Sequence, residues 1–129
     1  MEIQDESILR KFYVQPLYEE KISQIREIVG TNPVYFIVDE TMDICKRNVL
    51  NIMIGVLNGE YAKPMLFCQT ILESTNSTTV SQSLLDAFHK LWPNGVQYKN
   101  VWLILSTQAK YMIKAVNSIR SLFPNLHHI

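Results

Sequence analysis

The chain has 129 residues, of which 47% are apolar and 19% charged, so it is long enough for one domain with a buried core and its composition argues against disorder. Twelve basic and twelve acidic side chains cancel, and this neutrality weighs against a free-standing nucleic-acid binder, which usually carries net positive charge. The two cysteines form no CxxC pair. The sequence therefore predicts an intracellular protein, nuclear or cytoplasmic, without a membrane partner.

Residues 1–30 are predicted to form a helical lead-in. Apolar residues in it recur at spacings of three and four, as on one face of a helix. They are Tyr18, Ile22, Ile25 and Ile28 or Val29. A shorter helical piece around Ile8, Leu9 and Phe12 is expected before them, and "GTNP" at positions 30–33 ends the segment.

Three strands are predicted next. Residues 34–38, "VYFIV", form a continuous apolar run that is typical of a central strand buried on both faces. Residues 48–57 are a second strand, and "NGE" at 58–60 predicts a tight hairpin turn. Residues 64–72 form the third strand, antiparallel to the second.

The second half of the chain predicts a helix, a strand and a helix. Thr79 followed by Gln82 resembles a capping box at a helix start. The apolar stripe of that helix is Val80, Leu84, Phe88 and Leu91. Strand 101–105, "VWLIL", begins at Val101, ends at Leu105 and is expected to place Trp102 in the core. Residues 109–123 make the last helix, with Met112, Val116, Ile119 and Phe123 on one face.

The order of these elements predicts an α/β mixed sheet. Three strands joined by turns form an antiparallel meander, and the fourth strand arrives through a helix, so it lies parallel to the first by a right-handed crossover. Helices pack on the sheet faces. Three antiparallel strands, a helix, a parallel strand and a helix are the opening of the ribonuclease-H-like fold.

Two longer stretches resemble hAT-superfamily transposases. "VDETMDICKRNVLNIMIGVLNGE" is similar to the block around the first strand of that family, and "LSTQAKYMIKAVNSIRSLFPNLHHI" is similar to a later block that typically reads "TDAAPYM" and then "FPNLHHITCLAH". Residues 7–29 match the helical segment before the first strand. The resemblance implies a partial ribonuclease-H-like domain over residues 31–129, truncated or domesticated, with the fifth strand beginning near Leu126.

In that family three carboxylates hold divalent metal ions, typically Mg²⁺, for DNA strand transfer. The resemblance places Asp39 at the first carboxylate and Thr107, a neutral residue, at the second; the third, a glutamate, lies beyond "HHI" in the family. It therefore implies a catalytically inactive remnant that binds no cofactor and acts, if at all, by binding nucleic acid or protein. Two alternatives stay open: a Mg²⁺-dependent nuclease completed by other segments or chains, and a protein-interaction module.

The residues themselves leave other sites open. Asp39, Glu40 and Asp43 follow an apolar strand and either collect a metal weakly or form a solvated strand end, which is the favoured interpretation. Basic side chains either gather near this strand end and contact phosphate or are scattered surface charges, and scattered charge is favoured. They are Lys46, Arg47, Lys110 and Lys114.

Cysteine, histidine and tryptophan side chains are predicted to be structural. Cys45, beside two basic residues, is either reactive or an inert thiol, and Cys68 is expected in the core. His127 and His128 are neighbours on a strand and would point to opposite faces, so they would not share one ion. Trp92 is expected to cover the core at a helix end.

The strand edge at residues 101–105 predicts assembly. If the fifth strand is missing or only begun, this edge is long, apolar and free of charge and proline, and natural proteins avoid exposing such edges. Either the final residues fold back as a short stub, or a second chain covers the edge. We expect a homodimer through this strand.

Overall fold

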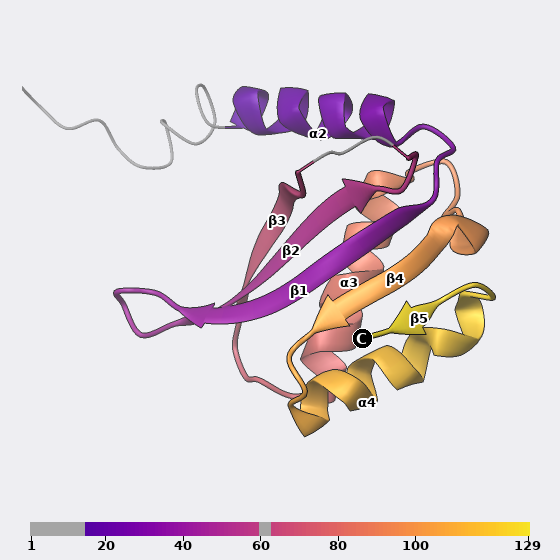
Figure 1. The fold of residues 1–129 in the computed structure, drawn as a ribbon. Helices are drawn as coiled ribbons and strands as arrows, with labels where there is room; N and C mark the ends of the chain where they lie inside the picture. Colours follow the sequence, from indigo (N-terminus) through magenta and orange to yellow (C-terminus); the bar gives the residue numbers. More distant parts are fainter. Residues whose placement is uncertain (1–14, 60–62) are drawn as a thin grey trace, which may run out of the picture.

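The structure is a computed structural model that describes residues 15–59 and 63–129 (Figure 1). Its elements are α2 (Gln15–Val29), β1 (Val34–Met42), β2 (Asn48–Val56), β3 (Met65–Leu72), α3 (Ser77–Leu91), the 3₁₀ turn η2 (Tyr98–Asn100), β4 (Val101–Ser106), α4 (Lys110–Ile119), the 3₁₀ turn η3 (Arg120–Leu122) and β5 (His127–His128). The helical piece expected around Ile8, Leu9 and Phe12 lies outside these residues. Among the helices that the structure describes, none is long and apolar enough to span a bilayer.

The described strands form a five-stranded sheet in the order β3-β2-β1-β4-β5. β1 is antiparallel to β2, which is antiparallel to β3, and β1 is parallel to β4. The α/β mixed sheet and the ribonuclease-H-like fold predicted from the sequence are confirmed. β5 is a short stub parallel to β4, with His127 opposite Leu103. Of the two arrangements expected at the β4 edge, the folded-back stub is therefore the one observed.

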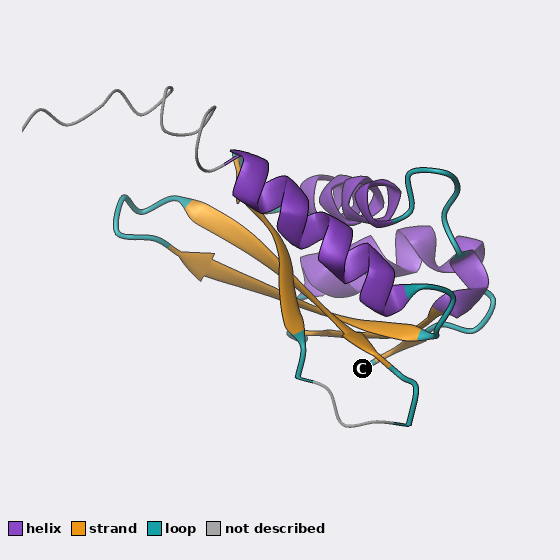
Figure 2. Cartoon of the chain, turned by 90° about the horizontal axis from the view of Figure 1, so that it is seen from above, coloured by secondary structure: helices purple, strands orange, loops and turns teal. Residues whose placement is uncertain are grey.

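Helices cover one face of the sheet, as Figures 1 and 2 show. Along β1 the side chains of Val34, Phe36 and Val38 point toward these helices and are buried. Tyr35 and Ile37 point to the opposite face, which we call the open face, and are only partly buried. The prediction that this strand is buried on both faces is therefore wrong, because no described helix packs on the open face.

The helix layer is joined to the sheet through aromatic contacts. Phe36 of β1 meets Phe88 of α3 edge to face, with ring centroids 4.9 Å apart. Phe88 meets Phe123, which follows η3, at 5.1 Å. The apolar stripes predicted for α3 and for the last helix are buried as expected.

The open face is partly covered by its own side chains. Tyr35 pairs with Gly55 across β1 and β2. A Cβ atom built on Gly55 would lie 2.1 Å from Cζ of Tyr35, so the ring lies directly over the glycine. A side chain at position 55 would have to displace this ring.

α3 begins at a different cap from the one predicted. Asn76 is the N-cap and accepts a hydrogen bond from the backbone N–H of Thr79 at 2.9 Å, while the Thr79 hydroxyl interacts with the backbone N–H of Asn76 at 3.3 Å. Thr79 is thus the third helical residue and not the cap, and Gln82 bonds Asp86 one turn later. The prediction failed because asparagine is as good a cap as threonine and lies three residues earlier.

Trp102 is not a core residue; its exposed fraction is 43%. The pairing of β4 with β1 passes from Val34–Val101 to Tyr35–Leu103, so Trp102 is an extra residue at a bulge. Its indole N–H donates to the Lys99 carbonyl at 3.1 Å. A bulge changes the face on which the following residues lie, and an apolar run does not reveal it.

The connection between β2 and β3 is longer than the predicted tight turn. β2 ends at Val56 and β3 begins at Met65, so no two-residue hairpin joins them; Glu60 of the predicted turn lies outside the described residues. The tight turn of the sheet joins β1 to β2 instead.

Replacing Asn76 tests the observed cap. We expect Asn76→Ala to lower the free energy of unfolding by about 1 kcal/mol, because a backbone N–H at the helix start loses its acceptor. Gln82→Ala, at the position that the sequence predicted for the capping box, should change it by less than about 0.5 kcal/mol. Urea unfolding followed by circular dichroism measures both, and a larger loss for Gln82→Ala would contradict the observed cap.

Candidate functional site

β1 continues beyond the strand beside it, and the candidate carboxylates lie on this projecting part. β4 stops at Ser106, opposite Val38. Asp39 and Glu40 are the next residues of β1 and still pair with β2, opposite Asn51 and Leu50. Asp39 and Glu40 therefore lie within the strand, whereas the sequence had suggested that they follow its end.

Asp39 lies on the open face and is exposed. Opposite it, Asn51 belongs to a row of polar side chains across the sheet. The Asn51 side-chain amide donates to the Thr41 hydroxyl at 3.0 Å and accepts from Gln69 at 2.7 Å. The Asp39 carboxylate thus stands in a polar environment that is open to solvent.

Glu40 points to the helix face and is held there. One carboxylate oxygen accepts from the Tyr111 hydroxyl of α4 at 3.1 Å and the other from the Thr75 hydroxyl before α3 at 3.3 Å. Burial and then the hydrogen bond and charge of Glu40 raise the pKa of Tyr111, and the charge of Asp39 adds to this. Glu40 therefore joins β1 to both helix starts.

Asp43 organises the turn between β1 and β2. Its Oδ1 accepts from the backbone N–H groups of Cys45 and Arg47, each at 2.9 Å, and its Oδ2 receives the Arg47 guanidinium at 2.8 Å. The hydrogen bond from the Arg47 backbone, together with its side chain, lowers the pKa of the Asp43 carboxyl. Both carboxylate oxygens of Asp43 therefore already accept hydrogen bonds from residues of this turn.

These positions do not fit a divalent metal. A hard cation needs several oxygen ligands within about 2.0–2.6 Å of one point, whereas Asp39 and Glu40 project to opposite faces and Asp43 lies in the turn. Thr107, which follows β4, is exposed and carries no charge. Within residues 15–59 and 63–129, no three His, Cys, Asp or Glu side chains are placed to hold a metal ion.

The four candidate basic residues lie on two separate elements. Lys46 and Arg47 are in the turn between β1 and β2, and Lys110 and Lys114 are exposed on α4. Figures 1 and 2 show this turn projecting away from α4. The strand from Val38 to Met42 alone extends about 13 Å past the end of β4, at roughly 3.3 Å per residue.

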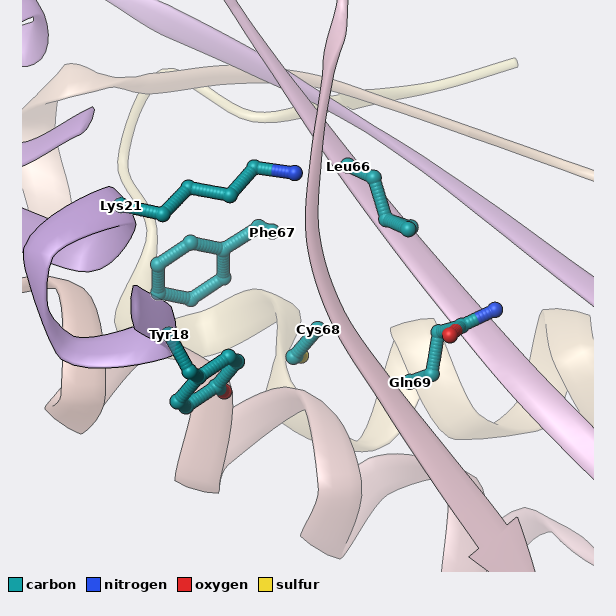
Figure 3. Close-up of a pocket in the computed structure, with 6 residues that line it drawn as sticks. All are labelled: Tyr18, Lys21, Leu66, Phe67, Cys68 and Gln69. Carbon is teal, nitrogen blue, oxygen red and sulfur yellow. The ribbon is translucent and has the colours of Figure 1, made fainter. Parts of the chain in front are cut away.

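The thiols differ in environment. Cys45 is exposed in the turn. Cys68 is only partly buried, which differs from the core position predicted for it, and burial raises its pKa. A bulge in β3 turns both Phe67 and Cys68 toward the helices, where they line a pocket of about 250 Å³ with Tyr18 and Lys21 (Figure 3).

The predictions for Trp92 and the two histidines agree with the structure. Trp92 is buried at the end of α3. His127 is exposed, whereas Nε2 of His128 lies 2.6 Å from the Ser106 hydroxyl. Burial and then the charge of Arg120 lower the pKa of His128.

Sequence reasoning missed the partners of Glu40. Thr75 and Tyr111 are 35 and 71 residues from it in the chain, so no local pattern announces the contact. The role of Asp43 did have a signal, because aspartate commonly accepts backbone hydrogen bonds from the residues that follow it in a turn.

No family model matches the chain, and no curated protein matches it. Among solved structures, it is similar to a catalytic domain of Mos1 transposase determined with raltegravir and manganese, with a TM-score of 0.48 and 12% identity over 98% of this chain and 62% of that chain. It is also similar to the catalytic domain of Mos1 mariner transposase, with a TM-score of 0.43 and 13% identity over 99% of this chain and 62% of that chain. The chain thus spans less than two thirds of either structure, and at this similarity the ribonuclease-H-like assignment rests on the sheet topology.

Truncating the two neighbouring carboxylates should have unequal effects on stability. We expect Glu40→Ala to lower the free energy of unfolding by about 1–3 kcal/mol, because two hydroxyl groups lose their acceptor. Asp39→Ala removes an exposed side chain and should change it by less than about 0.5 kcal/mol. Urea unfolding of both variants distinguishes them, and a larger loss for Asp39→Ala would mean that Asp39 has a structural partner.

The pKa of Tyr111 should be measurable by alkaline titration. The chain has six tyrosines, and Tyr111→Phe identifies the signal of this one in ultraviolet difference spectra. We expect Tyr111 to ionise above the usual value of about 10, and Glu40→Gln to lower its pKa. Since the folded-state pKa is raised, the contribution of this group to stability is intact below the unfolded-state pKa and is lost as the pH rises through the folded-state value. A Tyr111 pKa at or below the usual tyrosine value of about 10 would contradict the hydrogen bond to Glu40.

Proposed function

We propose that the chain is a transposase-derived ribonuclease-H-like domain of the hAT type that has no metal-dependent activity and acts by binding. The observation that carries the proposal is the divergence of Asp39 and Glu40. Asp39 keeps the position that the hAT resemblance gives to the first metal ligand. Its neighbour Glu40 bonds Tyr111 and Thr75 on the opposite side of the sheet.

The chemistry of strand transfer explains why this divergence matters. Metal-assisted displacement needs carboxylates that converge on ions bridging the attacking and leaving oxygens. Here Thr107 offers a neutral hydroxyl where the resemblance expects an aspartate, and a hydroxyl does not replace an anionic ligand. The alternative, a nuclease completed by other segments or chains, would need two further carboxylates beside Asp39.

Binding is therefore the function that we propose. A nucleic-acid partner and a protein partner are not equally well supported. Lys110 and Lys114 on α4 are separate from Lys46 and Arg47 in the turn between β1 and β2, so the four basic side chains do not form one cluster, and we expect weak DNA binding governed by salt. A protein partner is favoured by the open face, where apolar side chains stay partly exposed. They include Tyr35, Ile37, Met53, Leu103 and Leu105.

Metal-dependent DNA cleavage is the decisive measurement. We expect the chain to leave supercoiled plasmid uncut with Mg²⁺ or Mn²⁺, because the carboxylates do not converge. The variant Asp39→Ala, which should fold normally, is assayed beside it, and Lys110→Glu serves as a control for DNA contact.

The two variants separate the possible outcomes. Cleavage that disappears in Asp39→Ala would overturn the proposal and favour the nuclease, and its reduction in Lys110→Glu would place the DNA on α4. Cleavage that is equal in all three proteins would come from a contaminating nuclease.

A further inference from the structure

Trp102 is a large aromatic side chain that the fold turns outward and holds in place. It is the extra residue at the bulge in β4, and 43% of it is exposed. Bulges are rare between parallel strands, and they often redirect a side chain beside a functional site. The indole N–H donates to the Lys99 carbonyl at 3.1 Å, which restricts rotation of the ring. Trp102 therefore presents a flat apolar surface to solvent in a fixed orientation.

A pocket lies beside this ring. Trp102, Pro124, Asn125 and His127 line a space of about 350 Å³, and small-molecule sites typically occupy about 300–1,000 Å³. Figure 1 shows the start of β4 next to the loop that leads into β5. The Asn125 side-chain amide donates to the same Lys99 carbonyl at 2.9 Å. One backbone carbonyl therefore holds both the ring and the loop that form the pocket.

The chemistry of the pocket favours a planar ligand that carries negative charge. The face of an indole binds planar rings by stacking and cations by cation–π attraction. None of the residues that line the pocket is acidic, and Lys99, whose carbonyl holds both Trp102 and Asn125, has an exposed side chain. A cationic ligand would therefore meet a like charge without a counter-ion. A planar ring linked to a phosphate would find both a stacking surface and an ammonium group.

We propose that Trp102 stacks on one base of a single-stranded nucleic acid, with Lys99 beside the phosphate of that nucleotide. The single strand would be a partner in the binding function proposed above, on which this site depends. Stacking on an aromatic side chain needs a base that is unpaired and unstacked, so a duplex would not be bound here. A single platform holds one base, and stacking is tolerant of sequence. The binding should therefore be weak and nearly independent of sequence.

Fluorescence anisotropy of a labelled short oligothymidylate, in buffer with EDTA, tests the role of the ring. Trp102→Ala should raise the dissociation constant at least about fivefold, which is the lower end of what stacking on one base contributes. Ile28→Ala, on α2 with an exposed fraction of 51%, removes an exposed apolar side chain elsewhere and should leave the constant unchanged. Equal effects of the two variants, or no binding by the unmodified chain, would overturn the proposal.

Competition with other nucleic acids separates stacking from attraction to phosphate. An abasic strand of the same length keeps the phosphates but has no bases, so it should compete at least about fivefold more weakly than the oligothymidylate. A duplex of the same length should also compete more weakly, because its bases are already stacked. An abasic strand that competes equally well would show that phosphate contacts alone account for binding and would overturn the proposal. Thymidine monophosphate that competes as well as the strand would make the ligand a free nucleotide instead.

Acrylamide quenching of tryptophan fluorescence tests the same contact in the unmodified chain. Trp92 has an exposed fraction of 6%, so quenching by acrylamide reports mainly on Trp102. A saturating oligothymidylate should protect Trp102 from quenching, and the abasic strand should not. A proline-rich peptide and a trimethyllysine peptide are assayed beside them, because exposed aromatic side chains also bind these groups. Protection by either peptide but not by the oligothymidylate would overturn the proposal.

These measurements keep the base-binding site distinct from the loss of metal-dependent activity. EDTA removes divalent cations, so cleavage of the strand by a metal-dependent reaction does not enter the result. Plasmid cleavage that depends on Asp39 would overturn the proposed function and leave the effect of Trp102→Ala as measured. Uncut plasmid together with equal binding by Trp102→Ala and the unmodified chain would overturn the base-binding site alone.

Discussion

The packing of Phe36 against Phe88 and of Phe88 against Phe123 holds the structure together. These three rings come from β1, from α3 and from the segment after η3, and their centroids lie 4.9 and 5.1 Å apart. Phe36 and Phe88 are fully buried, and replacing such a ring by alanine typically costs about 3–5 kcal/mol. The contact fixes which face of β1 meets the helices and hence where every following side chain of the strand points.

That choice of face decides the chemistry of the projecting part of β1. Side chains alternate along a strand, so with Phe36 and Val38 toward the helices, Glu40 must follow them and Asp39 must face away. Glu40 then reaches Tyr111 and Thr75 and ties two helix starts to the strand. The same alternation that completes the core thus separates the two carboxylates.

The two sheet edges follow from the connections between strands. The parallel strand β4 is reached through α3, and the chain then returns through α4 to leave β5 on the outer side of β4. β3 is reached from β2 by an adjacent antiparallel connection, and no other described strand pairs with its outer side. One edge of the sheet is therefore covered by β5, while the other is an edge strand.

The sequence by itself determined the order of elements, the apolar stripes of α3 and α4, and the ribonuclease-H-like class, because periodicity and turn residues act locally along the chain. Only the tertiary structure decided that Trp102 is exposed at a bulge, that Cys68 is turned toward a pocket and that Glu40 bonds residues 35 and 71 positions away. Bulges and long-range hydrogen bonds depend on which strands become neighbours. Local sequence patterns do not show which strands pair, because the pairing depends on how distant segments pack against one core.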